Sequence, residues 1–438
     1  MAVEQSIHDI HFAQAPQVET DIPGPNSRAL IERQRGIETN AVAYPRDVPI
    51  APAEARGATI RDADGNVFLD FFAGIGVLNV GHANPYVLDG VREQLDALTH
   101  SLDFPTAARL DLIEALDEIA PGDLSGDNRV IFGGPTGSDA IEATIKLAKY
   151  NTGGNGMIAF RGAYHGDTAG AVSLTAAKKF KRDSAPQLAD VVHAPYPNPQ
   201  RMGVGPDEAV DRALSEVREI LEDPYGGLAN PAGIWVEAIQ GEGGVVVPPA
   251  GFLPGLRELA DEHDLPLIVD EIQTGFGRTG GWFASDHEGV TPDAVPMAKA
   301  IGGVGLPLGA TMFRSDLDSW KPGGHVGTFR GHVPAMVGGR RAIEYIRTHD
   351  LLTHAREIGD YIRSRLAELE DRVPGLVDVR GRGMFVGAEF ADADGNPDGD
   401  AVEAVQEYCY ERGVLVWTAG RGGSVLRLIP PLVLTREQ

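Results

Sequence analysis

The sequence contains a single cysteine, Cys409, among 438 residues. One thiol excludes an internal disulfide, and this scarcity is typical of a protein in a reducing compartment. The surrounding text, QEYCYERG, is typical of a helix, so we interpret Cys409 as a packed thiol rather than a reactive one. Cysteine usage therefore predicts a cytoplasmic location.

Long hydrophobic runs are also missing. No stretch of about 18 or more apolar residues occurs, which excludes a membrane-spanning helix. The polar N-terminal text, MAVEQSIHDIHFAQAPQVETDI, has no basic region followed by an apolar one, so it does not resemble a secretory signal. A mean hydropathy of -0.14 predicts a soluble globular protein without a membrane partner.

Positive charge is scarce, and lysine is the scarcer of the two cations. Asp and Glu total 63 against 38 Lys and Arg, which gives a net charge of -25. This balance argues against a nucleic-acid partner, because affinity for phosphate backbones needs clustered cations. An acidic, lysine-poor surface suits high salt, where screening removes most self-repulsion, and we expect a halophilic source. The lysines are Lys146, Lys149, Lys178, Lys179, Lys181, Lys299 and Lys321.

What the sequence does contain is a regular alternation of strands and helices. From residue 129 to 313, apolar runs such as GMIAF and GIWVEAI alternate with helical patterns such as DEAVDRALSEVREIL. This alternation predicts an α/β fold with a mostly parallel sheet and helices on both faces. Residues 61–72 predict a hairpin with a primed turn at their Asp-Gly pair, and 84–100 and 106–120 predict helices. The length exceeds one core, so we expect a second domain.

The most informative segment is residues 267–310, LIVDEIQTGFGRTGGWFASDHEGVTPDAVPMAKAIGGVGLPLGA. An apolar run ends at Asp270, and a carboxylate at the end of a buried strand lies where open α/β sheets place their ligand crevice. Lys299 stands in an apolar, glycine-rich setting, where desolvation lowers the pKa of an amine and suits it to form a Schiff base. Such a lysine and carboxylate are the protein half of pyridoxal phosphate chemistry. As patterns alone, a helix cap and a surface lysine explain them equally well.

The text VDEIQTGFGRTG followed by MAKAIGGVGLPLGA resembles the signature of class III aminotransferases, which are fold type I enzymes dependent on pyridoxal 5'-phosphate. The resemblance implies a large domain with a mixed, mostly parallel sheet flanked by helices, and a small α+β domain built from both chain ends. It implies an N-terminal arm at 1–25, the first part of the small domain at 26–75, the large cofactor-binding domain at 76–335, and the rest of the small domain at 336–438. It also implies a homodimer or larger homo-oligomer with a shared active site.

The resemblance assigns several cofactor contacts. Gly137 and Ser138 begin a predicted helix after a strand, a position whose free N–H groups bind anions, and they match the phosphate-binding segment of the family. Tyr164 in RGAYHGDTAGA matches the aromatic residue that stacks on the pyridine ring, and His165 beside it has a supporting role. Taken alone, Gly137 and Ser138 are an ordinary helix cap and Tyr164 an ordinary core aromatic.

The opening motif supplies the catalytic residues that the resemblance implies. Asp270 pairs with the pyridinium N–H, and Gln273 donates to the ring oxygen O3'. Lys299 forms the Schiff base with the cofactor and then moves the substrate proton as general base and acid. Thr328 in GGHVGTFRG reaches the cofactor phosphate of the neighbouring subunit. We expect no metal.

Two glutamates in VEAIQGEGGVVVPP match a family segment that faces the substrate. Glu237 stands at a strand end near Asp270. Glu242 matches a glutamate that pairs with an arginine near the C-terminus, and that arginine is Arg427 here. The pair implies a switch, in which Glu242 covers Arg427 in one half-reaction and frees it to bind the α-carboxylate of 2-oxoglutarate in the other. The alternative is a purely structural ion pair.

The substrate follows less directly. Many relatives that act on 4-aminobutyrate or ornithine have arginine after the aromatic-His-Gly motif, whereas this chain has Asp167. An aspartate there disfavours a carboxylate and favours a second amine. The text GPTGS, WKPGGH and GTFRG resembles diaminobutyrate aminotransferases. We therefore predict transfer of the ω-amino group of 2,4-diaminobutyrate or 4-aminobutyrate to 2-oxoglutarate by a ping-pong mechanism.

Alternatives remain open. Other stretches, including PGPNSRALIE and HAPYPNP, resemble archaeal enzymes of the same class, some of which racemise amino acids. An aminotransferase for ornithine, or for another ω-amino acid with pyruvate, is a further alternative, and a non-catalytic binding protein is the third. The family also continues beyond the PPL segment into another helix, whereas this sequence stops at Gln438, so we expect either a truncation or the absence of that helix.

Overall fold

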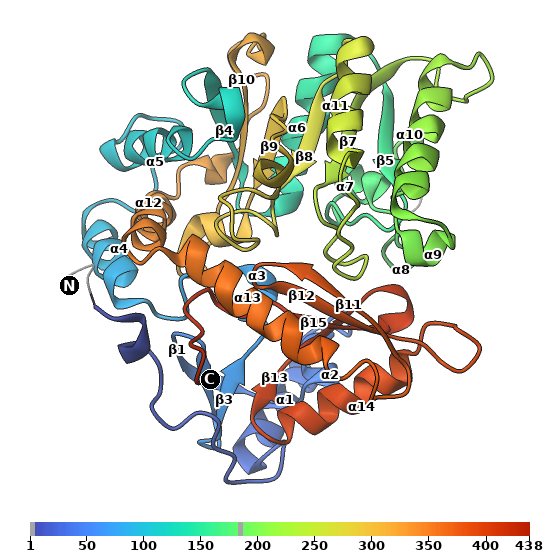
Figure 1. Cartoon of the computed structure of the whole chain (residues 1–438). Coiled ribbons are helices and arrows are strands. Elements are labelled where there is room, and N and C mark those ends of the chain that lie inside the picture. Colours follow the sequence, from blue (N-terminus) through green and yellow to red (C-terminus); the bar gives the residue numbers. More distant parts are fainter. Residues whose placement is uncertain (1–4, 183–186) are drawn as a thin grey trace.

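The computed structural model describes residues 5–182 and 187–438 (Figure 1). The strands are β1 Pro52–Arg56, β2 Thr59–Asp62, β3 Val67–Asp70, β4 Asn128–Gly134, β5 Gly156–Phe160, β6 Val191–Ala194, β7 Pro231–Glu237, β8 Leu267–Asp270, β9 Ala294–Met297, β10 Gly309–Arg314, β11 Leu376–Arg382, β12 Phe385–Phe390, β13 Val414–Leu415, β14 Trp417–Ala419 and β15 Val425–Leu428. The α-helices are α1 Pro25–Ile37, α2 Tyr44–Asp47, α3 Ala73–Gly76, α4 Pro85–Ala97, α5 Ala107–Asp117, α6 Gly137–Thr152, α7 Ala169–Leu174, α8 Lys178–Lys181, α9 Pro199–Met202, α10 Pro206–Glu222, α11 Phe252–Glu262, α12 Val333–Thr348, α13 Leu351–Ala367 and α14 Gly399–Tyr410.

The largest sheet has seven strands in the order β4-β10-β9-β8-β7-β5-β6 and occupies the upper part of Figure 1. Neighbouring strands from β9 through β6 run parallel, whereas β10 runs antiparallel to both β4 and β9. This confirms the predicted mixed, mostly parallel sheet. None of the helices in the described part of the chain combines the length and hydrophobicity needed to cross a bilayer.

Helices cover both faces of this sheet because its central strands are apolar on both faces up to their carboxyl ends. In β5, Ile158 and Phe160 belong to one buried cluster with residues of α10 and α11, while Met157 and Ala159 belong to another with residues of α6. Successive side chains of a strand point to opposite faces. A strand that is buried on both faces therefore has a continuous apolar sequence, and this is the pattern from which β5 was predicted.

Two four-stranded sheets form the lower part of Figure 1, in the orders β1-β2-β3-β13 and β11-β12-β15-β14. Strand β13 near the C-terminus pairs in parallel with β3, with Val414 opposite Leu69. Segments from both chain ends therefore build one sheet. Cys409 lies on α14 and packs, partly buried, against the apolar cluster beneath β12 and β15.

The predicted hairpin at 61–72 is confirmed, but its primed turn is wrong. Strands β2 and β3 are joined by residues 63–66, and of Asp64 and Gly65 only Gly65 has a positive φ, of +94°. A type I′ turn needs positive φ at both central residues, and a type II′ turn needs it at the first. The Asp64 carboxylate instead accepts hydrogen bonds from the backbone N–H groups of Asn26 (2.7 Å) and Ser27 (2.8 Å) at the start of α1. This contact fixes the loop in another conformation.

The parallel strands bring the candidate site together at their carboxyl ends. Glu237 ends β7 and lies opposite Asp270, which ends β8. Lys299 follows β9 directly and begins a 3-10 turn, Lys299–Gly302. Residues that are far apart in the sequence therefore meet at one edge of the sheet, as expected for this type of fold.

Candidate active site

A cavity of about 410 Å³ opens at this edge of the sheet. Its volume is in the range of small-molecule binding sites. Nine of the residues predicted from the sequence line it: Gly137, Ser138, Tyr164, His165, Glu237, Glu242, Asp270, Gln273 and Lys299. Their roles are considered in turn below.

Asp270 and His165 form a buried pair at the base of the cavity. The Asp270 Oδ2 and His165 Nδ1 atoms lie 2.8 Å apart, and the backbone N–H of Ile272 donates to the other Asp270 oxygen at 3.0 Å. Burial by itself lowers the pKa of His165, but its hydrogen bond to Asp270 and the nearby negative charges raise that pKa overall. The pair therefore fixes the Asp270 carboxylate in one orientation, with a negative charge facing the cavity.

Lys299 lies on the wall of the same cavity in an unusual backbone conformation. Its φ of +50° is in the left-handed region, which costs an L-residue roughly 1 kcal/mol or more. Desolvation by the surrounding walls lowers the pKa of Lys299 to about 8, although the negative charges of Glu242, Asp270 and Glu237 oppose the shift. An amine with this pKa is partly neutral near pH 8 and is a good nucleophile.

The N-terminus of α6 forms the anion-binding part of the cavity. Gly137 and Ser138 are its first two residues, so their N–H groups have no acceptor within the helix, and both residues line the cavity. Thr136 and Asp139 form a reciprocal capping box that fixes this helix start. A Cβ atom added to Gly137 would lie 3.0 Å from Ile272. A side chain at this position would therefore press on Ile272.

Tyr164 lines the cavity and is held from two directions. Its backbone N–H donates to Glu237 at 2.9 Å, and its ring packs against Phe180 with 4.9 Å between the ring centroids. Burial and the charges of Asp167 and Glu242 raise the pKa of Tyr164 to about 12. Tyr164 is therefore a neutral, fixed aromatic ring at neutral pH, as a stacking role requires.

Glu237 and Gln273 are also fixed by backbone contacts. Glu237 accepts hydrogen bonds from the N–H groups of Tyr164 and Gly241, both at 2.9 Å. Burial raises its pKa to about 7. Gln273 donates to the Ile75 carbonyl at 3.2 Å, and its side-chain oxygen lies so close to Gly241 that a Cβ there would be 1.8 Å away. Glu237 thus holds the loops that carry Tyr164 and Gly241.

Glu242 and Arg427 form an ion pair with 2.7 Å between Oε1 and Nη1. Arg427 lies on β15, is fully buried, and has no hydrogen-bond partner within the described structure for Nε and Nη2. Burial raises the pKa of Glu242, but the charge of Arg427 and its hydrogen bond outweigh this and lower the pKa overall. Glu242 lines the cavity, whereas Arg427 lies behind it. The guanidinium therefore has unused donors that Glu242 shields.

The structure does not bring Thr328 and Asp167 into this cavity. Thr328 begins the 3-10 turn Thr328–Arg330 and is exposed in a separate hollow beside Leu102 and Phe104. Asp167 is also exposed, and its backbone N–H donates to the Ser138 hydroxyl at 3.1 Å. Within one chain, neither side chain belongs to the cavity wall.

Other cavity-lining residues were not predicted. They are apolar or small, and include Val77, Ile239, Leu306, Pro307 and Leu308. An aromatic cluster of Tyr44, Phe72 and Trp417 lies nearby, with ring centroids 4.8 to 6.2 Å apart, and the charges of Glu242 and Arg427 act on Tyr44. Leu306, Pro307 and Leu308 stand in the quoted segment MAKAIGGVGLPLGA, whereas the aromatic cluster comes from segments far apart in the sequence, so no local motif indicates that cluster.

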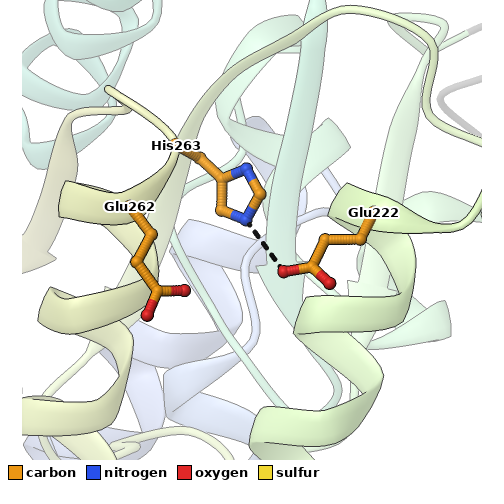
Figure 2. Close-up of side chains that lie close together, drawn as sticks. All are labelled: Glu222, Glu262 and His263. Atoms are coloured by element: carbon orange, nitrogen blue, oxygen red, sulfur yellow. Dashed lines mark ion pairs between the residues drawn. The ribbon is translucent and has the colours of Figure 1, made fainter.

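A possible metal-ligand cluster lies away from the cavity, at the ends of α10 and α11. Figure 2 shows Glu222, Glu262 and His263 facing one another, with 3.4 Å between His263 Nε2 and Glu222. Arg218 pairs with both carboxylates, at 2.6 Å from Glu222 and 2.8 Å from Glu262. Because this guanidinium already neutralises them, we interpret the cluster as an ion-pair network.

The cavity residues fit pyridoxal phosphate. The α6 N-terminus suits a phosphate, Asp270 offers a fixed carboxylate to a pyridinium N–H, and Lys299 offers a partly neutral amine to an aldehyde. Tyr164 supplies an aromatic face between these groups. Together the four features match the phosphate, the ring nitrogen, the aldehyde and the ring face of this cofactor.

Comparisons with known proteins agree with this chemistry. Residues 41–438 match the family model described as aminotransferase class-III. The chain is 39% identical over 418 residues to the diaminobutyrate–2-oxoglutarate aminotransferase of Rhizobium meliloti, which covers 92% of this chain and 88% of that one. It is 34% identical over 438 residues to the alanine/serine racemase of Pyrococcus horikoshii, with 98% and 91% covered.

Solved structures also match. The ornithine aminotransferase of Toxoplasma gondii, which contains pyridoxal phosphate at partial occupancy in its active site, superposes with a TM-score of 0.81 and 31% sequence identity. The match covers 94% of this chain and 91% of that one. The fold and the cavity chemistry therefore have counterparts in proteins of established structure.

Proposed function

The chain belongs to the class-III aminotransferase family, and on this premise we propose that it transfers the ω-amino group of 2,4-diaminobutyrate or 4-aminobutyrate to 2-oxoglutarate. It is a fold type I transaminase that depends on pyridoxal phosphate. The observation that carries the choice of substrates is the buried Arg427, whose unused donors lie behind Glu242. Such an arginine suits the α-carboxylate of a keto acid.

The residues that would hold the cofactor are those at the base of the cavity. Gly137 and Ser138 would bind its phosphate, Asp270 its ring nitrogen, Gln273 its ring oxygen and Lys299 its aldehyde carbon. The bound cofactor supplies an electron sink next to the substrate nitrogen. Tyr164 and the Asp270–His165 pair keep the ring plane and the negative charge in fixed positions.

Lys299 carries the proton transfer. Once the substrate nitrogen has replaced it, its Nζ atom accepts the proton from the carbon that bears the amino group. The lowered pKa of Lys299, about 8, allows the amine both to accept and to return a proton near neutral pH. The walls around it exclude most water, so the proton is not lost to solvent.

Glu242 and Arg427 separate the two half-reactions. An ω-amine donor presents no carboxylate next to its reacting carbon, so Glu242 stays on Arg427 and neutralises it. A 2-oxo acid does present one, and its carboxylate competes for the Nε and Nη2 donors that Glu242 leaves unused. One site thereby accepts both substrates in turn, as a ping-pong mechanism requires.

The donor is supported by the relatives and by Asp167. The relatives of this chain include several diaminobutyrate–2-oxoglutarate aminotransferases, at 33 to 39% identity. The negative charge of Asp167 acts on the cavity residue Tyr164. The same charge would attract the second ammonium group of diaminobutyrate. We therefore rank diaminobutyrate ahead of 4-aminobutyrate as the donor.

We further propose a homodimer in which Thr328 serves the partner's active site. Thr328 lies among exposed apolar side chains, of which Phe104, Val326 and Phe329 are 63 to 73% exposed. Beside them Arg330 is buried, and its Nε and Nη2 atoms have no hydrogen-bond partner in the described residues. Apolar patches of this kind mark interfaces. Sedimentation of the holoenzyme at the mass of a single chain would contradict the dimer.

A cytoplasmic location and a halophilic source also belong to this proposal. The net charge of -25 and the seven lysines support the latter. The division into an arm, a small domain from both chain ends and a large domain is proposed with the boundaries given above. Activity that is highest at low ionic strength would argue against halophily.

The racemase is the second candidate function, because one relative is an alanine/serine racemase at 34% identity. A racemase needs a second acid or base on the side of the cofactor opposite Lys299. No motif in the sequence indicates a residue for that role. A racemase also has no use for a covered arginine such as Arg427.

A half-reaction experiment tests the proposed function. The holoenzyme is mixed in high salt with single donors (diaminobutyrate, 4-aminobutyrate, ornithine, β-alanine or L-leucine), and the visible absorbance of its cofactor is followed. We expect rapid loss of that absorbance with diaminobutyrate and its return on addition of 2-oxoglutarate. If no donor changes the absorbance while chiral chromatography detects epimerised L-leucine or L-alanine, the enzyme is a racemase.

A further inference from the structure

Three of the seven lysines of this acidic chain lie on one short helix, α8 Lys178–Lys181. The text there is KKFK, followed by Arg182. The rest of the sequence takes its positive charge mostly from dispersed arginines. A cluster of lysines in a chain with a net charge of -25 is therefore a local departure from the average surface.

Ring contacts connect α8 to the active-site cavity. The Phe180 ring packs against the ring of the cavity residue Tyr164, with 4.9 Å between centroids. The Nζ atom of Lys179 lies 4.8 Å from the centroid of the Phe180 ring. A cation over an aromatic ring is attracted to it. Lys179 is thus held one ring away from the cavity wall.

The charge of Lys179 acts on acidic groups at the same place. It helps to lower the pKa of Glu242, a residue of the cavity wall, and it opposes the rise that burial causes in the pKa of Asp47 on α2. Lys181 differs, because its Nζ donates to the Ser173 carbonyl at 3.0 Å. Of these two lysines, Lys179 is therefore the one whose charge acts on a residue of the cavity wall.

The proposed substrates require a second cation. The acceptor 2-oxoglutarate has two carboxylates, and Arg427 accounts for only the one next to the carbonyl. Among the described residues that line the cavity, Lys299 is the only lysine or arginine, and the cofactor and the proton transfer occupy it. The wall therefore offers no second lysine or arginine to the far carboxylate, whereas Lys179 is a cation whose charge acts on the wall residue Glu242.

Resting on the proposed function, we propose that Lys179 is a specificity-determining residue that binds the substrate carboxylate farthest from the reacting group. In 2-oxoglutarate this is the distal carboxylate, and in diaminobutyrate it is the α-carboxylate.

The test compares the Lys179→Met holoenzyme with Lys178→Met, which removes a neighbouring exposed lysine from the same helix. We expect Lys179→Met to raise the KM for 2-oxoglutarate about fivefold, which is the change in affinity expected from the loss of one exposed ion pair. The KM for pyruvate, which lacks the distal carboxylate, should not change. Lys178→Met should change neither value, and Lys179→Arg should restore most of the 2-oxoglutarate value. Equal effects of the two Met variants, or equal effects on both keto acids, would overturn the proposal.

A binding measurement separates this inference from the proposed function. Glutarate and butyrate bind without reacting, and calorimetry on the holoenzyme gives their dissociation constants in each variant. We expect the wild type to prefer glutarate over butyrate and Lys179→Met to lose that preference. This result would hold even if no ω-amine donor were consumed, in which case only the proposed function fails. An unchanged preference in Lys179→Met overturns the role of Lys179 even in an active transaminase.

Discussion

The cavity has two regions that are built in different ways. The cofactor region consists of Asp270, His165 and Lys299, which stand at or just after the ends of strands in one sheet. The substrate region consists of Glu242, Arg427 and Lys179, which come from a loop, a strand of the second part of the molecule and a short helix. The first region is rigid because sheet hydrogen bonds fix it, and the second depends on how separate segments pack.

This difference indicates how the two regions divide the work. The cofactor region handles the chemistry that every substrate shares, so damage to it should affect all substrates alike. The substrate region contains a paired cation and a cation near the surface, so damage to it should distinguish one substrate from another. The predictions below test this division, beginning with the largest effect.

Replacing Lys299 tests the cofactor region most severely. Lys299→Ala should lower turnover with every donor by at least about 10³-fold, because it removes both the covalent attachment and the proton carrier. The absorbance of covalently attached cofactor should disappear as well. Lys299→Arg is the matched control, since it keeps the charge but is not expected to form the Schiff base. Substantial turnover in either variant would contradict the role of Lys299.

Replacing Arg427 should instead separate the two half-reactions. Arg427→Met replaces the buried guanidinium with an uncharged side chain of similar length. The kcat/KM for 2-oxoglutarate should fall about 100-fold, as expected when one partner of a buried charge pair is lost. The half-reaction with 4-aminobutyrate should fall much less. Arg427→Lys keeps the charge but loses the two-point contact. Its kcat/KM for 2-oxoglutarate should therefore lie between the values of the wild type and of Arg427→Met. Equal losses in both half-reactions would make the Glu242–Arg427 pair structural.

Replacing Glu242 should change donor preference without abolishing activity. Glu242→Gln uncovers Arg427, so glutamate should gain relative to the ω-amine donors, and the ratio of their half-reaction rates should shift about tenfold. Glu258→Gln, an exposed change on α11, serves as the control. An unchanged ratio in Glu242→Gln would indicate that Glu242 does not cover Arg427 during catalysis.

The same contrast explains what the sequence predicted well. The alternation of apolar runs and helices identified the strands of the large sheet because apolar runs and the turn residues that end them are local properties. Asp270 and Lys299 were expected at the site from the resemblance to the family signature, and both line the cavity. The functional roles of these residues stay predictions until the variants above are measured.

The remaining features depend on contacts between distant segments. The Asp64-Gly65 turn was wrong because Asp64 accepts hydrogen bonds from Asn26 and Ser27, which no turn pattern encodes. The unpaired donors of Arg427 became visible only through its burial on β15. No sequence motif indicated a role for Lys179, because its link to Tyr164 runs through the ring of Phe180. Such contacts require the tertiary structure.

The pKa of Lys299 provides the smallest and most specific test of the cofactor region. Desolvation lowers this pKa to about 8 from the ordinary value of 10.5, so the neutral, reactive fraction should be about one-tenth at pH 7, one-half at pH 8 and nine-tenths at pH 9. The rate at which the apoenzyme captures pyridoxal phosphate should therefore rise roughly tenfold from pH 7 to 9 and then level off. Stopped-flow absorbance measures this rate. A rate that keeps rising tenfold per pH unit through pH 10 would mean that Lys299 keeps the pKa of an exposed lysine, and that the cavity walls do not desolvate it.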